Sequence, residues 1–174
     1  MNTERNEFEL LREKNILAIL DGDVEFGSLE INGVESVIKI SMPYLTGPKL
    51  CEISNKFGLP ISYNWNGGAQ IRWTYLSDLM AHCIQNKSES DLLSFIFSKG
   101  QFAEKLKGLT PENIEYAYSY IVNAVIEQIN GALYFGGNEL VRIGSSFVIR
   151  KIGTNVTVVT PSIKTIDREY IIDI

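Results

Sequence analysis

The stretch Ile40–Trp73, ISMPYLTGPKLCEISNKFGLPISYNWNGGAQIRW, contains the densest set of turn and helix signals in the chain. It holds three of the five prolines and both tryptophans. Thr46–Pro48 (TGP) is typical of a helix start, because a threonine side chain caps the first free amides and proline fits the first turn. Gly58 is typical of a helix end, and Pro60 prevents the helix from resuming. The stretch therefore predicts one short helix held between two turns.

The residues before this helix predict another helix and a hairpin. Residues 1–20 place most apolar side chains on one helical face, and Asp21–Asp23 (DGD) ends that helix with turn residues. Residues 29–41 contain two β-prone runs around Asn32-Gly33, the strongest signal for a two-residue hairpin. We therefore expect a tight hairpin centred on this dipeptide.

The second half of the chain predicts helices followed by strands. Residues 74–97 show two helical patterns, which Ser77 and Ser88 would cap. A Thr-Pro pair opens the strongest helix signal, which runs from about 111 to 130 and ends at Gly131. Short β-prone runs follow at residues 133–135, 139–143, 146–152 and 156–160.

Together these patterns predict an α+β fold, with a helical core around one long helix (about 111–130) and short β-hairpins. Because a long helix leads into a hairpin, we expect the C-terminal part to be winged-helix-like. A chain of 174 residues fits one domain, which we place at residues 1–160, with a linker or tail at 161–174. The chain stops just after an apolar run, so we expect it to be a segment of a longer protein.

The composition is that of a globular protein, with 45% hydrophobic and 21% charged residues. No apolar run approaches the roughly 20 residues that span a bilayer, and the charged N-terminus lacks a signal-peptide core. We therefore expect a soluble, cytoplasmic protein without membrane contact, in which Cys51 and Cys83 are small buried side chains. The formal net charge of −5 disfavours a broad grip on nucleic acid, but it leaves room for a local basic patch.

The sequence does not show the residue patterns of common catalytic sites. His82 is the single histidine, which excludes a histidine-rich metal site. There is no glycine-rich phosphate loop that ends in lysine, and no dinucleotide-binding fingerprint. We therefore predict no catalytic residue, no metal and no cofactor within these residues.

Aromatic residues around the end of the opening stretch form the first candidate site. With an arginine among them, they are suited to stack on a base or to clamp a protein segment. The alternative is that the tryptophans fill the core while the arginine satisfies a buried carbonyl. The candidate binding residues are Tyr63, Trp65, Arg72, Trp73 and Tyr75. A pocket for a nucleotide second messenger would be lined by Tyr63, Trp65 and Trp73.

The second candidate site is basic and lies on the predicted C-terminal hairpin. Its residues are Arg142, Arg150 and Lys151. As the wing of a winged-helix module, they would contact a phosphate backbone. Ordinary exposed strand positions explain the same residues, so both interpretations stay open.

Three segments of the chain carry a family likeness: Met42–Leu50 (MPYLTGPKL), Asn55–Gly58 (NKFG) and Arg72–Tyr75 (RWTY). They resemble three motifs in the N-terminal domains of bacterial abortive-infection proteins of the J type. The first motif starts a helix, the second ends it, and the third precedes the next helices. Residues 124–152, a helix that leads into GGNELV, look like the usual ending of that domain. The resemblance covers roughly residues 40–152 and consists of structural motifs.

The resemblance implies a non-catalytic sensor, regulatory or interaction domain of an antiphage defence protein. Such a domain is joined to an effector, often an RNase of the HEPN type with a closely spaced arginine and histidine. Here Arg72 and His82 are too far apart for that motif, so RNase activity is not implied for this chain. The expected partners are a phage-derived trigger or the linked effector, with nucleic acid or a nucleotide as alternatives. An oligomer is compatible with this role.

Overall fold

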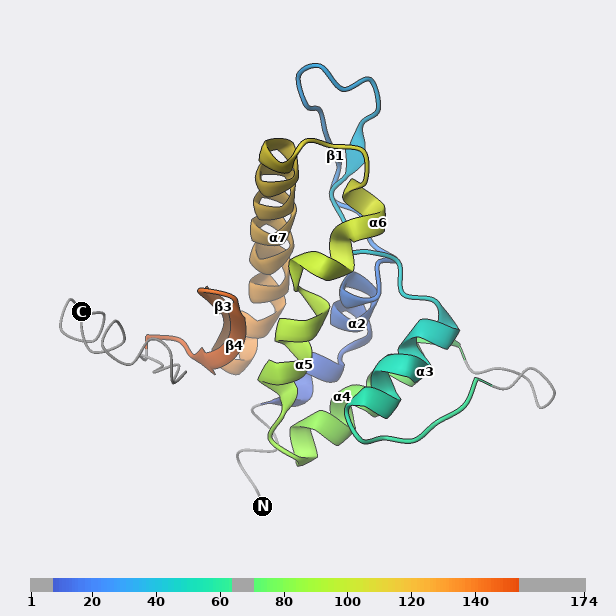
Figure 1. Ribbon diagram of the computed structural model, residues 1–174. Helices are drawn as coiled ribbons and strands as arrows, with labels where there is room; N and C mark the ends of the chain where they lie inside the picture. Colours follow the sequence, from blue (N-terminus) through green and yellow to red (C-terminus); the bar gives the residue numbers. More distant parts are fainter. Residues whose placement is uncertain (1–7, 64–70, 154–174) are drawn as a thin grey trace, which may run out of the picture.

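The computed structural model describes residues 8–63 and 71–153 and is mostly helical (Figure 1). In chain order the elements are η1 (Glu9–Arg12), α2 (Lys14–Leu20), β1 (Ser28–Leu29), β2 (Ile38–Lys39), α3 (Gly47–Lys56), α4 (Arg72–Gln85), α5 (Glu89–Ile96), η2 (Lys99–Phe102), α6 (Ala103–Leu106), α7 (Pro111–Leu133), η3 (Tyr134–Gly136), β3 (Asn138–Ile143) and β4 (Ser146–Lys151), where η marks a 3-10 helix. Each described sheet has two antiparallel strands, β1 with β2 and β3 with β4. The predicted α+β class is therefore confirmed.

The long helix α7 begins where the sequence places its start signals. Thr110 Oγ1 accepts a hydrogen bond from the Asn113 amide at 3.2 Å, and Pro111 occupies the first turn. One stripe of the helix is buried, as expected for a central helix. Its buried residues are Ala117, Tyr118, Ile121, Val122, Val125, Ile129 and Leu133.

The end of α7 differs from the prediction. Gly131 lies inside the helix. Residues 133–135 were predicted to form a strand, but the first of them is the last residue of α7 and the other two begin η3. The helix continues because Leu133 is buried in the core. The packing of this side chain outweighs the low helix propensity of Gly131. Gly137 ends the helical run with a φ of +76°, a conformation that glycine adopts at no steric cost.

The single helix predicted for residues 1–20 is wrong in its described part. It is divided into η1 and α2 at Glu13, which is extended, with ψ at 137°. In one continuous helix Leu11 and Leu20 would point in opposite directions, because nine steps of about 100° end half a turn away. Both side chains are buried, and the break at Glu13 allows both to reach the core.

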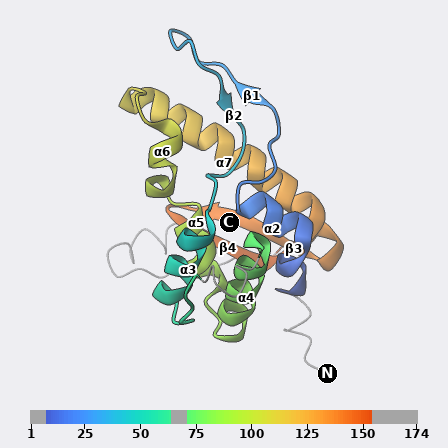
Figure 2. The ribbon, with the colours of Figure 1, turned by 90° about the vertical axis from the view of Figure 1, so that its right-hand side faces the viewer.

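The first hairpin is wider than the two-residue turn predicted at Asn32-Gly33. β1 and β2 pair through two residues each, and residues 30–37 form the loop between them. The Val34 amide donates to the Ile31 carbonyl at 3.0 Å, so Asn32-Gly33 still forms a local turn. Gly33 has a φ of +83°, but Asn32 does not have the positive φ that a two-residue type I′ hairpin needs at both positions. The loop projects from the molecule near the junction of α6 and α7 (Figures 1 and 2).

The short helix predicted in the opening stretch is confirmed as α3. The Lys49 amide donates to Thr46 Oγ1 at 3.2 Å, which makes Thr46 the cap. The helix stops before Gly58, whose amide donates to the Asn55 carbonyl at 3.2 Å. The start and the end of α3 are thus both set by residues within it or directly beside it.

Residues 74–97 do form two helices, but the serine caps are not where the pattern placed them. α4 begins two residues earlier than predicted, so Ser77 lies inside it, buried, and accepts a hydrogen bond from Arg12 Nη2 at 3.1 Å. Ser88 precedes α5, but its hydroxyl donates to the Cys83 carbonyl at 3.4 Å instead of capping the helix.

The β3–β4 hairpin was predicted and is present, and helix side chains bind its backbone. Asn130 on α7 accepts from the Leu140 amide at 2.6 Å and donates to the Leu140 carbonyl at 2.9 Å. Ser94 on α5 does the same for Phe147, at 2.8 Å and 3.2 Å. The Phe147 ring stacks on Phe97 with the ring centres 4.8 Å apart. The hairpin is therefore fastened to both helices.

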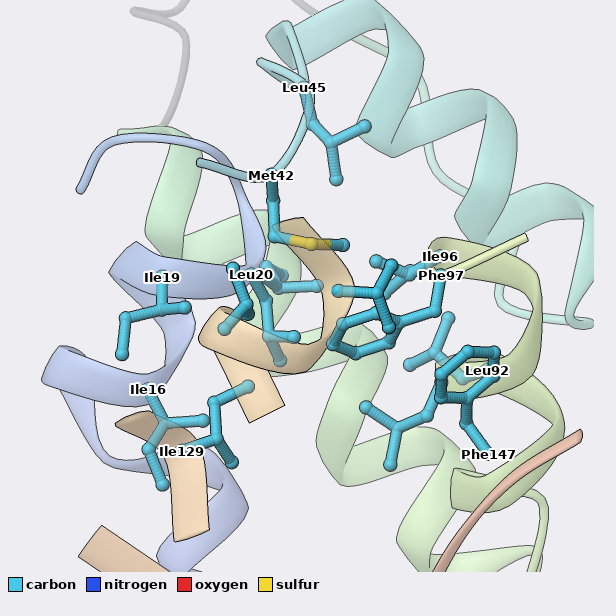
Figure 3. Packing of buried hydrophobic residues seen from close by; sticks show 14 of the residues in the cluster. Ile16, Ile19, Leu20, Met42, Leu45, Leu92, Ile96, Phe97, Ile129 and Phe147 are labelled. Carbon is cyan, nitrogen blue, oxygen red and sulfur yellow. The ribbon is translucent and has the colours of Figure 1, made fainter. Parts of the chain in front are cut away.

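Buried apolar side chains form one cluster that extends along the chain from Leu11 to Phe147. Figure 3 shows part of it, with side chains of α2 facing those of α5 and Met42 lying above them. Cys51 and Cys83 are both buried, as predicted. Among the described residues, no helix has the length and apolar character needed to cross a membrane. The strand predicted at 156–160 and the tail at 161–174 lie outside the described residues.

Candidate functional site

Arg72, at the first position of α4, binds two separate segments of the chain, the Asp21–Asp23 turn and the residues just before α3. Its Nε donates to the Leu45 carbonyl at 2.6 Å, and its Nη2 donates to the Asp21 carbonyl at 2.7 Å. Its Nη1 pairs with the Asp23 carboxylate at 2.5 Å. Its guanidinium carbon lies 3.7 Å from the centre of the Tyr44 ring. The arginine of the first candidate site therefore donates its hydrogen bonds to the protein's own backbone and to Asp23.

Asp21, the first residue of the predicted DGD turn, is a buried acid beside this arginine. Its Oδ1 accepts from the Asp23 amide at 3.1 Å and lies 3.8 Å from Arg72 Nη2. Its Oδ2 is buried without a hydrogen-bond partner among the described residues. Burial first, and then its interaction with the Asp23 side chain, raises the pKa of Asp21 to about 7, although the charge of Arg72 lowers it. The signal in the sequence was the DGD turn itself, but burial is not visible there.

Both candidate tyrosines pack inward. Tyr75 is 3% exposed, and its ring centre lies 5.9 Å from that of Tyr63. Tyr63 is half-buried and lies over Gly47, where a Cβ atom would meet the Tyr63 ring at 2.2 Å. The pair therefore fills the space between α3 and α4, and Tyr75 offers no ring face to a ligand.

Trp73 is the candidate tryptophan that the described residues include. Trp73 is half-buried against the core, and Lys14 Nζ lies 5.5 Å from its ring centre. Trp65 lies outside the described residues. The structure thus brings Arg72, Trp73 and the tyrosines into one region, but it uses them mainly for packing.

The three basic residues of the C-terminal hairpin do not form one patch. The register places Arg142 opposite Phe147 and Arg150 opposite Glu139, so the two arginines project from opposite faces of the sheet. Arg150 Nε pairs with Glu139 at 3.0 Å, and Arg142 lies over the Phe147 ring at 5.8 Å. Lys151 shares a face with Arg142, but it lies at the other end of the hairpin. This separation disfavours the wing-like phosphate contact.

A concave basic surface lies elsewhere, between the β1–β2 loop and the chain that joins α6 to α7. We call it the lysine groove; its volume is about 390 Å³. The groove is lined by Val34, Ser36, Val37, Ile38, Lys39, Lys105, Lys107, Gly108 and Leu109. The groove is not visible in the sequence, because its two walls are far apart in the chain and neither wall has a motif of its own.

The three lysines of the groove have different environments. Lys39 and Lys107 are exposed, and they pair with Glu25 at 3.4 Å and with Glu104 at 3.1 Å. Lys105 is half-buried, and its Nζ lies 3.0 Å from the Ser41 hydroxyl. Burial, followed by the charge of Lys39, lowers the pKa of Lys105, whereas Glu25 raises it.

The single histidine has a structural contact. His82 Nε2 lies 2.9 Å from the Phe57 carbonyl and joins α4 to the end of α3. Within residues 8–63 and 71–153, no group of three or more His, Cys, Asp or Glu side chains is arranged to hold a metal ion.

Comparisons with family models, with curated proteins and with solved structures found no match to this chain.

Proposed function

We propose that this chain is a non-catalytic recognition domain of a bacterial abortive-infection protein, which binds a trigger and controls a linked effector. The observation that carries the proposal is the lysine groove, a concave surface in which two distant segments place three lysines beside apolar side chains. A concave mixture of apolar walls and a few polar groups is the usual form of a ligand site.

The family part of the proposal is supported by the motifs that resemble the J-type domains. In this chain the TGP motif starts α3, and Arg72 of the RWTY motif binds the Leu45 carbonyl within the MPYLTGPKL motif. Gly47 of the same motif lies beneath the Tyr63 ring. The motif residues therefore contact the protein itself, which is what shared structural motifs are expected to do.

A phage challenge of bacteria that carry the complete gene tests the proposal. We expect the wild-type gene to reduce phage yield, and a variant with Lys39, Lys105 and Lys107 replaced by alanine to lose that protection. Lys49→Ala is the control, because Lys49 also makes an i,i+3 ion pair, with Glu52 at 3.5 Å, but is not among the residues lining the groove. Equal phage yields with and without the gene would count against a defence role.

A second measurement tests the non-catalytic part. Purified protein is incubated with RNA and with nucleoside triphosphates, and the products are separated by chromatography. We expect both to be recovered intact. Turnover that co-purifies with the protein and disappears after a single substitution in this chain would show that the domain is an enzyme.

A further inference from the structure

We infer that the lysine groove binds a small phosphate-bearing ligand of mononucleotide size. In this arrangement Lys39, Lys105 and Lys107 face the phosphate, and the apolar wall receives the rest of the ligand. The inference rests on the proposed recognition function and specifies its ligand. It follows from the residues that line the groove, their charges and its size.

The charge of the groove differs from that of the whole chain. The formal net charge is −5, yet three lysines line the groove, and among the described residues only Glu25 and Glu104 form ion pairs with them. Both of these ion pairs are on the surface, where such pairs contribute little and exchange readily. An anion can therefore replace the two glutamates as the partner of Lys39 and Lys107.

Lys105 is the residue that most favours an anion. It is half-buried, and among the described residues its Nζ lies close to the Ser41 hydroxyl without a carboxylate at ion-pair distance. A partly buried ammonium group without a counter-ion is costly to desolvate. A phosphate in the groove would offset this cost, and it offers several acceptor oxygens to the three amines.

The remaining lining explains why the ligand is expected to be larger than inorganic phosphate. The groove volume of about 390 Å³ is in the range of small-molecule sites. Val37 is 54% exposed although it is apolar, and it lines the groove together with Ile38 and Leu109. These side chains suit the flat, weakly polar face of a nucleobase or a similar ring.

Isothermal titration calorimetry with the full chain tests the inference. The probes are adenosine monophosphate, guanosine monophosphate, pyrophosphate and uncharged adenosine, each at low and high salt. We expect saturable binding of at least one mononucleotide, weaker binding of pyrophosphate, and no binding of adenosine. The affinity should fall as salt rises, because the contacts to phosphate are ionic.

Two groove variants and one control make the test specific. Lys105→Met retains an apolar stem and removes the charge, and Lys107→Ala changes an exposed side chain, so it is expected to leave the fold intact. Each should weaken mononucleotide binding about tenfold, as expected for one charge-assisted hydrogen bond. Lys49→Ala should bind like the wild type. Circular dichroism of each variant verifies that it is folded.

The outcomes separate this inference from the proposed function. If neither mononucleotide binds, if adenosine binds equally well, or if Lys105→Met and Lys107→Ala leave affinity unchanged, the ligand assignment is overturned. Binding only of long oligonucleotides would overturn it as well. Protection against phage could persist in any of these cases, which would leave the recognition function standing. Hydrolysis of a bound mononucleotide would instead support the site and reject the non-catalytic function.

Discussion

Arg72 shows how one side chain can join parts of a protein that local sequence does not connect. Its Nη2 reaches the Asp21 carbonyl, 51 residues earlier in the chain, and its Nε reaches the Leu45 carbonyl. A guanidinium group has a planar fork of donors, so it can hold several acceptors at once. The residue that looked suited to stacking on a ligand therefore orders the turn before the first hairpin, the approach to α3 and the start of α4.

Replacing Arg72 with lysine should destabilise the fold although the charge is kept. A lysine ammonium cannot reach both carbonyls and the Asp23 carboxylate, so at least one buried acceptor is left unpaired, at about 1–3 kcal/mol. We expect the free energy of unfolding in urea to fall by about 2 kcal/mol. Arg150→Lys is the control, because the half-buried Arg150 pairs with Glu139 through one nitrogen and a lysine ammonium can still make that contact, so it should change stability by less than about 1 kcal/mol. Equal effects of the two substitutions would contradict the role given to Arg72.

Asp21 should make stability depend on pH. Its pKa is about 7 in the folded protein and 3.8 as an ordinary aspartate, so between these values the folded state keeps a proton that the unfolded chain has released. The contribution of Asp21 to stability should therefore be highest below about pH 4, fall as pH rises to about 7, and then level off, with a total change of at most about 4 kcal/mol.

Asp21→Asn isolates this effect from the other titrating groups. Urea unfolding of the wild type and the variant is measured at several values between pH 4 and pH 8. The difference in stability between the two proteins should shift steadily in favour of the variant up to about pH 7. A difference that stays constant across this window would mean that Asp21 is not protonated in the folded state.

At the scale of elements, helix starts follow from neighbouring residues, whereas helix lengths follow from packing. Thr46 and Thr110 cap α3 and α7 with the same hydrogen bond to the amide three residues later. By contrast, α7 runs through Gly131 because Leu133 is buried beyond it. Gly131 and Gly47 both lie in helices, but only Gly47 is crowded by a neighbouring side chain. The two glycines should therefore respond differently to substitution.

Gly131→Ala should stabilise the protein, and Gly47→Ala should destabilise it. At Gly131 a Cβ atom meets no atom within 4 Å, so alanine improves helix propensity by about 0.5–1 kcal/mol. At Gly47 the Cβ would lie 2.2 Å from the Tyr63 ring, and displacing the ring should cost about 1–3 kcal/mol. Thermal unfolding of both variants checks the signs. A lower melting temperature for Gly131→Ala would show that this glycine has a role beyond the helix.

At the scale of the whole molecule, the terminal hairpin belongs to the same core as the first helices. The buried cluster includes Leu11 near its beginning and Phe147 near its end. Asn130 and Ser94 also fasten the hairpin backbone to α7 and α5. The described residues should therefore unfold together, and not in separate parts.

Phe147→Ala tests this cooperativity. Phe147 is 1% exposed and stacks on Phe97, so its truncation should cost about 3–5 kcal/mol. We expect tryptophan fluorescence and far-ultraviolet circular dichroism to report the same lowered unfolding midpoint. Phe135→Ala, at a side chain that is 88% exposed, is the control and should leave the midpoint nearly unchanged. Two separate transitions in the Phe147 variant would show that the hairpin and the helices are independent units.

The sequence by itself determined the features that depend on a few neighbouring residues. These are the α+β class, the start and end of α3, the start of α7, and the β3–β4 hairpin. A cap, a first-turn proline or a turn glycine acts within about four residues, so its effect is visible in a short window of sequence. The neighbourhood of Arg72 was also found this way, and the contact of its side chain with backbone carbonyls was one of the two alternatives that the sequence left open.

Only the tertiary structure decided the features that depend on contacts between distant segments. The break at Glu13, the extension of α7 past Gly131, the burial of Asp21 and the packing of Tyr75 all follow from burial in a shared core. The lysine groove belongs to the same group, because Lys39 and Lys105 come together only when the β1–β2 loop packs near α6. Local sequence patterns do not show which distant segments come into contact, because the free energy of burial depends on the whole fold.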